Sequence, residues 1–282
     1  MTIIIRPLQS QEEFSEGEKL QKEIWGFADR EITPLNEMVV MQHNGGLVFG
    51  AFEGARMVAF CYGMPAYKDK KVYHYSRMLG VLSRFQDQGL GYKMKMFQRN
   101  WVSQHQLDLI KWTFDPLQSR NGFFNIEKLG VIIREYAINI YGNSSSVFNA
   151  GLETDRFVVE WQINSKRVSN KLKKSGSEVS VASIIEKKKY DPLILTAINK
   201  DGYLEPQGVR LYSKAKKVCV ELPDNINEMK NFDKELAVTW RFETRKVFTE
   251  MFKRGYVIIG FSTGVHKNRR RCYYLLKKRP KN

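Results

Sequence analysis

Two glycines, Gly89 and Gly91, stand where a polar turn meets the start of an amphipathic segment. A short apolar run ending at Val81 precedes the turn. After the turn, apolar residues recur with the 3.6-residue period of a helix, at Leu90, Met94, Phe97 and Trp101. Unpaired N–H groups at a helix start bind anions, and glycine lets a ligand approach the main chain closely. The stretch therefore predicts a phosphate-binding turn between a strand and a helix.

The wider spacing of this stretch is Leu79-x-Val81-x-Ser83-x-x-Gln86-x-x-Gly89-Leu90-Gly91. An ordinary strand-to-helix loop is the alternative interpretation. The spacing resembles the pyrophosphate-binding motif of the GNAT N-acetyltransferase superfamily. That resemblance implies acetyl-coenzyme A (acetyl-CoA) as the ligand, with its pantetheine arm along the strand edge at Leu79 and Val81. It places the pyrophosphate on the main chain of Gln86, Asp87, Gln88, Gly89, Leu90, Gly91 and Tyr92.

The composition is that of a folded protein: 43% of the 282 residues are hydrophobic and 12% are aromatic. No apolar run has the ~18 to 20 residues of a membrane span. The N-terminal MTIIIRPLQS lacks the features of a signal peptide, so we expect a cytoplasmic location. The three cysteines form no C-x-x-C pair and the four histidines have no paired spacing, so we expect no disulfide framework and no metal site.

The formal charge of +16 is distributed unevenly. Residues 1–160 hold 18 Lys and Arg against 18 Asp and Glu, whereas residues 161–282 hold 28 against 12. The part that carries the phosphate turn is therefore neutral. Attraction to an acidic partner, such as nucleic acid, must come from the second part.

The pattern upstream of the turn predicts a strand, two helices and three antiparallel strands. Their expected ranges are 2–6, 11–25, 36–43, 47–53, 56–64 and 71–81. After the turn helix we expect a strand at 108–114, a polar turn at 118–121 and then a helical segment through 124–128. A left-handed Gly130 and another strand at 132–140 should follow. This order is that of a GNAT fold. Residues 112–125 also resemble a branch of predicted bacterial and archaeal acetyltransferases without an assigned substrate.

We therefore expect an α+β chain with a mixed sheet, of the GNAT acyltransferase type, at 1–163. The lysine- and serine-rich segment 164–189 is expected to be a solvated linker. A smaller basic α+β domain is expected at 190–282. Its expected elements are strands at 193–198, 218–222, 256–261 and 272–276, a helix at 225–254 and a basic loop at 266–271.

Acetyl transfer to an amine needs a base for the amine proton and a donor for the oxyanion. The N–H of Val81 is the candidate donor. In the resembled family a Glu or His often stands four or six residues before this position, where the present chain has Arg77 and Tyr75. Arginine cannot act as a base at neutral pH. His74, on the opposite strand face by alternation, and Glu37 are the other candidates.

Three further groups of residues are candidates for weaker roles. The tyrosine that assists the leaving thiolate in the resembled family falls on Ile126, with Tyr136 and Tyr141 nearby in sequence. Asn121 and Asn125 can hydrogen-bond the pantetheine amides or simply cap the helix. Cationic side chains for the 3′-phosphate, or ordinary surface charges, are Lys93, Lys95 and Arg120.

Two hypotheses follow. The first is an enzyme that transfers acetyl from acetyl-CoA to an amine. The second is a GNAT-like module that binds acyl-CoA with weak turnover and docks on nucleic acid or an acidic partner through residues 165–282. The one-sided charge and the absent base favour the second, and the phosphate turn with its matching strand order favours the first.

Overall fold

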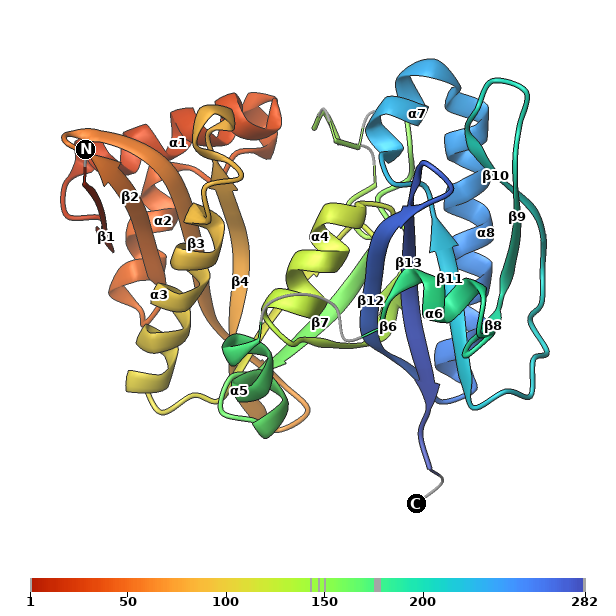
Figure 1. Ribbon diagram of the computed structural model, residues 1–282. Coiled ribbons are helices and arrows are strands. Elements are labelled where there is room, and N and C mark those ends of the chain that lie inside the picture. Colours follow the sequence, from red (N-terminus) through yellow and green to blue (C-terminus); the bar gives the residue numbers. More distant parts are fainter. Residues whose placement is uncertain (1, 143, 147, 150, 175–178, 281–282) are drawn as a thin grey trace. The chain divides into compact units, whose positions relative to one another are not determined.

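The computed structural model describes residues 2–142, 144–146, 148–149, 151–174 and 179–280 (Figure 1). The chain divides into two compact units. Unit 1 comprises Met1–Trp112, Ser144–Ala150 and Gln162–Asn164, and unit 2 comprises Thr113–Asn143, Gly151–Trp161 and Ser165–Asn282. Among the described residues, no helix combines the length and the hydrophobicity that a membrane span needs.

Unit 1 is built on the paired strands β1 to β5, with helices on both faces. Its strands are β1 (Ile3–Pro7), β2 (Leu47–Glu53), β3 (Arg56–Lys68), β4 (Lys71–Val81) and β5 (Leu109–Phe114). Its helices are α1 (Gln11–Trp25), α2 (Leu35–His43) and α3 (Leu90–Gln104), with short 3₁₀ turns η1 (Asp29–Glu31) and η2 (Ser83–Phe85). Strands β1 to β4 pair antiparallel in order, and β5 adds parallel to β4. The predicted mixed α+β class is confirmed.

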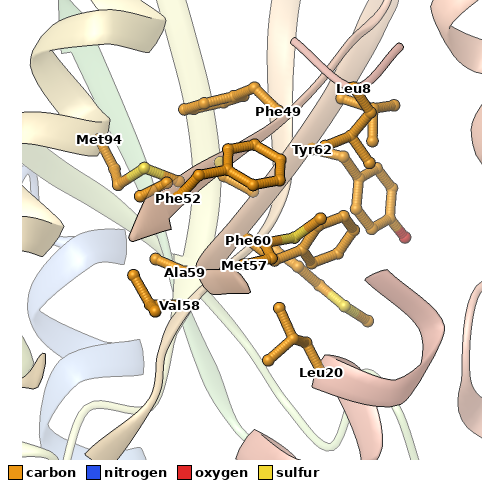
Figure 2. Close-up of a cluster of buried hydrophobic side chains, with 14 of the residues drawn as sticks. Leu8, Leu20, Phe49, Phe52, Met57, Val58, Ala59, Phe60, Tyr62 and Met94 are labelled. Carbon is orange, nitrogen blue, oxygen red and sulfur yellow. The ribbon is translucent and has the colours of Figure 1, made fainter. Parts of the chain in front are cut away.

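The core of unit 1 lies on both faces of β2 and β3, which have almost continuous buried runs (Figure 2). Phe49 of β2 packs against Phe97 of α3, with ring centroids 5.0 Å apart. Phe60 of β3 points to the opposite face, where a Cβ added to Gly17 of α1 would lie 3.0 Å from its ring. Apolar runs of this kind form where helices cover a strand on both sides.

Helix α1 shows why the local sequence predicted this region well. Ser10 caps its N-terminus by accepting the N–H of Glu13, and Gly26 ends it in the left-handed conformation at φ 68°. The Glu13 carboxylate in turn accepts the N–H of Gln9 at 2.7 Å and pairs with Arg6. These signals are local, so the predicted range 11–25 is confirmed.

Within unit 2 the strands pair in the order β7, β6, β12, β13, β11, β8, with a separate β9–β10 hairpin. Its strands are β6 (Ile132–Ala137), β7 (Arg156–Gln162), β8 (Asp191–Pro192), β9 (Ile194–Ile198), β10 (Leu204–Val209), β11 (Lys217–Leu222), β12 (Tyr256–His266) and β13 (Arg269–Lys278). Its helices are α4 (Ser119–Phe123), the π-helix η3 (Phe124–Lys128), α5 (Lys166–Lys173), α6 (Val181–Ile185), α7 (Ile226–Phe232) and α8 (Lys234–Lys253).

An aromatic cluster explains why residues 113–161 fall mostly in unit 2, whereas the predicted first domain extended to 163. Phe157 of β7 lies 4.8 Å from Phe248 of α8 and 5.3 Å from Tyr274 of β13, between ring centroids. Phe114 packs on Phe157 at 5.7 Å. Buried aromatic pairs contribute strongly to a core. The present cluster joins strands that are far apart in the sequence.

The segment predicted as a solvated linker contains helices α5 and α6, a correction to that prediction. Lys171 of α5 is buried and pairs with the buried Glu127 at 2.7 Å. The Arg167 guanidinium donates to the carbonyl oxygens of Gly130 and Ile259. Lysine composition predicted solvent exposure, but specific partners elsewhere in unit 2 hold these cations. Residues 175–178 of the predicted linker lie outside the described residues.

Other boundaries differ for local reasons. The predicted helix 225–254 is two helices, because Asp233, at φ −138°, leaves the helical conformation and caps α8 by accepting the N–H of Leu236. The predicted basic loop is mostly strand, and only Lys267 and Asn268 form the turn, at φ 48° and 60°. Strand β6 ends at Ala137 rather than 140.

Candidate functional site

The predicted phosphate turn joins β4 to α3 in unit 1. Leu82 and Phe85 are buried and anchor the turn, whereas residues 86–89 are exposed. Asp87 and Gly89 adopt left-handed φ values of 60° and 77°. Asp and Gly are the residue types that adopt this conformation most readily. The turn thus bends sharply into α3, as the strand, turn and helix prediction required.

Main-chain donors collect at the start of α3. The first helical hydrogen bond runs from the Lys93 N–H to the Gly89 carbonyl, at 3.1 Å. The N–H groups of Leu90, Gly91 and Tyr92 precede it, and they have no acceptor among the residues that the structure describes. Because the α3 dipole adds positive potential at the same point, the turn favours an anion.

The space above these donors is open. A Cβ added to Gly89 would meet no atom within 4 Å, and one added to Gly91 would meet only Leu79 Cδ2, at 4.0 Å. By contrast, a Cβ at Gly63 or Gly80 of the same unit would collide with neighbours below 3.0 Å. Gly89 and Gly91 therefore leave room for a ligand, whereas Gly63 and Gly80 are glycines for packing.

Two glutamine side chains of the predicted site brace the turn. The Gln86 amide donates to the Val81 carbonyl and the Gln88 amide to the Arg84 carbonyl, both at 3.0 Å. These bonds cross the turn and hold its two limbs together. Their role in the structure is therefore to position the main-chain donors.

Replacing Gln86 with alanine is expected to loosen the turn. Losing one exposed hydrogen bond costs about 1 kcal/mol, so amide hydrogen exchange of residues 86–92 should accelerate about fivefold. Hydrogen exchange measured by mass spectrometry checks this, with Ser83→Ala in the same turn as the control. Equal exchange in the two variants would contradict the bracing role.

The edge of β4 also presents main-chain groups. The Leu82 N–H donates to the Val58 carbonyl of β3 at 3.0 Å. Since main-chain groups of successive strand residues point to opposite sides, the N–H groups of Val81 and Leu79 point away from β3. In the described chain β4 pairs with β5 only at His74–Ile110 and Tyr75–Lys111. The Leu79 and Val81 groups thus lie on an edge without a strand partner.

Among the proposed catalytic side chains, Tyr75 is half-buried on the same β4 face as Arg77, Leu79 and Val81. A bulge at Arg77 interrupts the pairing with β3. Glu37 is exposed in the first turn of α2. The catalytic roles of Tyr75 and Glu37 stay predictions.

His74 lies in the interior, on the opposite face of β4, as alternation predicted. Its ring is fully buried, and its Nε2 lies 3.1 Å from the Gln98 amide nitrogen. Gln98 accepts a hydrogen bond from the buried Lys95 ammonium, which also donates to Ser76, both at 2.9 Å. His74 Nδ1 has no hydrogen-bond partner in the described part of the chain.

This environment keeps His74 neutral. Burial, the largest cause, and the nearby charges of Lys95 and His105 together lower the pKa of His74 to about 3. Burial likewise lowers the pKa of Lys95 to about 8. A fully buried imidazole with this pKa cannot take a proton from a substrate amine at neutral pH, which argues against His74 as the base.

The prediction that Lys95 could bind the 3′-phosphate of the coenzyme is corrected. Its ammonium is buried and lies 4.0 Å from the centroid of the Trp112 ring, so it cannot reach a ligand phosphate. Sequence reasoning missed this buried polar cluster. The signal was present, since Lys95 and Gln98 share the helix face of Met94 and Val102, which are buried. Lys93, two residues before Lys95 in the first turn of α3, is exposed.

Unit 2 holds the remaining predicted residues. Asn121 is exposed on α4, and Asn125 is buried on the π-helix η3, a form common at functional sites. Ile126 is fully buried. Tyr136 donates to Asp155 at 2.7 Å, and burial raises its pKa, so it does not act as a mobile acid. Gly130 adopts the predicted left-handed conformation at φ 79°.

Cys61, Cys219 and Cys272 are buried and free of disulfides. No cluster of three or more His, Cys, Asp or Glu side chains within the described ranges has the geometry to hold a metal ion.

No protein-family model and no curated protein matches this sequence. Similar solved structures include the ribosomal-protein-S18-alanine N-acetyltransferase from Escherichia coli (13% identity, TM-score 0.46, 63% of this chain, 99% of the other). Another is the NatC complex bound to Gag peptide and CoA (16% identity, TM-score 0.47, 58% of this chain, 100% of the other). A third is an acetyltransferase of the GNAT family from Streptococcus pneumoniae (12% identity, TM-score 0.45, 56% of this chain, 98% of the other). The last is of the family that the motif resembles. At these identities and TM-scores, the likeness assigns no activity or residue role to this chain.

Proposed function

We propose that this protein is an N-acyltransferase that moves an acetyl group from acetyl-CoA to an amine. The observation that carries the proposal is the turn before α3, where the donors of Leu90, Gly91 and Tyr92 face open space above Gly89. A diphosphate matches such a set of donors in charge and hydrogen bonding. The spacing that resembles the GNAT motif lies on this same turn.

The edge of β4 that has no strand partner supports a position for the pantetheine arm of acetyl-CoA. An extended pantetheine arm carries amide groups, which can pair with main-chain groups of a strand edge as an added strand would. The N–H of Val81 lies at that edge and is the proposed donor to the oxyanion of the tetrahedral intermediate. This chain would thus contribute binding, orientation and one charge-stabilising donor.

The reaction also requires a base that removes the amine proton. The β4 face shared with Val81 carries Tyr75 and Arg77, without a carboxylate or imidazole, and His74 is buried. This observation favours a second candidate, a module that binds acyl-CoA with weak turnover. In that candidate the basic residues 165–282 dock on nucleic acid or an acidic partner. The cytoplasmic location stays a prediction.

Calorimetric titration of the purified chain tests the proposal. Acetyl-CoA should bind, and S-acetylpantetheine, which lacks every phosphate, should bind at least about tenfold more weakly, because the main-chain donors contact the diphosphate. Equal affinity for the two compounds would refute the turn as the binding element. Release of free CoA with a panel of peptide, polyamine and aminoglycoside amines then separates an enzyme from a binding module.

A further inference from the structure

A cavity of about 720 Å³ lies within unit 2, between α6, β9 and the β11–β13 strand pair. Its volume falls in the range of about 300 to 1,000 Å³ that is typical of small-molecule sites. All of its lining residues belong to unit 2. The cavity is therefore a feature separate from the turn before α3.

The cavity exists because one face of the sheet is only partly covered. Tyr274 of β13 faces α8, where its ring lies 5.5 Å from Phe248. By alternation, Tyr273 of β13 and its cross-strand partner Glu221 of β11 point to the opposite face. There the short helix α6 covers part of the surface with Val181 and Ile184.

The neighbouring strands leave the remainder open. Strand β8 consists of two residues, and β9 leaves the main sheet to pair with β10. Apolar side chains line the resulting space. They come from three elements and include Ile184, Ile194, Leu195 and Tyr273. These walls suit an apolar ligand body.

The charges around the cavity have one dominant sign. Six basic and two acidic side chains line it. Both acids are held by protein groups: Glu221 by Arg271 at 2.7 Å and by the Thr196 hydroxyl at 2.6 Å, and Asp191 by Arg210 at 3.6 Å.

The other four basic side chains are exposed and have no ion-pair partner in the ranges that the structure describes. They are Lys188, Lys189, Lys216 and Lys217. Uncompensated lysines beside an apolar wall attract a ligand that is anionic at one end and apolar at the other.

We propose that this cavity binds a small amphipathic organic anion, a molecule with one apolar body and one carboxylate, sulfonate or phosphate head. The body lies against Ile184, Leu195 and Tyr273. The head faces the lysine pairs at 188–189 and 216–217. The site goes beyond acyl transfer and does not depend on the proposed coenzyme binding.

Two dyes with the same aromatic body test the proposal on the full chain. 8-Anilinonaphthalene-1-sulfonate is an organic anion, and N-phenyl-1-naphthylamine lacks the sulfonate. The sulfonate dye should bind saturably at one site, about tenfold more tightly than the neutral dye, and decanoate should displace it. Raising the ionic strength from about 0.05 to about 0.5 M should weaken the binding of the sulfonate dye and leave that of the neutral dye unchanged. Equal affinity for the two dyes would overturn the proposal.

Matched variants locate the site. Leu195→Glu places a carboxylate in the wall, and Ile198→Glu is its control, because Ile198 is on the same strand, similarly exposed (41% against 37%) and outside the cavity. Lys216→Glu/Lys217→Glu has the control Lys200→Glu/Lys214→Glu, with the same change in net charge. Each cavity variant should bind the sulfonate dye about tenfold more weakly than its control does. Equal affinities within each pair, or displacement of the dye by a single-stranded oligonucleotide but not by decanoate, would overturn the proposal.

Discussion

Gly89→Glu is expected to reduce the affinity for acetyl-CoA by more than about a hundredfold, through charge repulsion at short range. The new side chain enters the space above α3, where a Cβ meets no atom within 4 Å. Its carboxylate can accept the hydrogen bonds of the free N–H groups itself, and it repels the diphosphate. Calorimetric titration with acetyl-CoA measures the loss.

The matched control for this variant is Gly54→Glu in the β2–β3 turn. Gly54 also has a positive φ, 60° against 77° for Gly89, and also has no atom within 4 Å of an added Cβ. Both variants therefore carry the same new charge and a similar left-handed strain of about 1 to 2 kcal/mol. Thermal unfolding should shift equally in the two, whereas only Gly89→Glu should lose the ligand. Unchanged affinity in Gly89→Glu would remove the basis of the proposed function.

The second large effect concerns acid stability. His74 has a pKa of about 3 in the folded chain against a reference value of 6.5. As pH falls below 6.5, the unfolded chain takes up a proton that the folded chain refuses, so the free energy of unfolding decreases until pH reaches about 3. Between pH 7 and pH 4 this one group should remove about 3 kcal/mol of stability.

His74→Gln should abolish that loss. The glutamine amide does not titrate, and its oxygen can accept the Gln98 hydrogen bond that the imidazole nitrogen holds at 3.1 Å. Urea unfolding at several pH values between 4 and 7 should show a smaller acid loss for His74→Gln than for the wild type, by about 3 kcal/mol at pH 4. His43→Gln, at an exposed position at the end of α2, should behave as the wild type does. Parallel curves for His74→Gln and the wild type would show that His74 is not held neutral.

Sequence patterns predicted unit 1 well because its signals are local. Ser10 and Gly26 mark the ends of α1, strand alternation separates His74 from Tyr75, and Gly89 marks the bend into α3. Each of these signals acts over a few residues through main-chain conformation or side-chain period. The order of elements up to β5 and the location of the turn before α3 could therefore be predicted.

The errors arose where a residue's environment depends on distant partners. Lys95 was predicted at the surface because lysine is charged, yet Ser76 and Gln98 hold it in the interior. Segment 164–189 was predicted as a linker, yet Glu127 and Gly130 hold Lys171 and Arg167 of α5 in place. Charged side chains are expected at the surface from composition, but a buried hydrogen-bond or ion-pair partner can hold such a side chain in the interior.

The sequence by itself determined the strand, turn and helix around Gly89 and the chemistry expected there, because glycine, turn and period act locally along the chain. Only the tertiary structure decided that His74 is sealed from solvent and that 113–161 joins the C-terminal aromatic core. It alone also decided that the β11–β13 face beside Tyr273 is left open. The physical reason is that burial depends on which surfaces meet across the fold, and residues far apart in the sequence supply those surfaces.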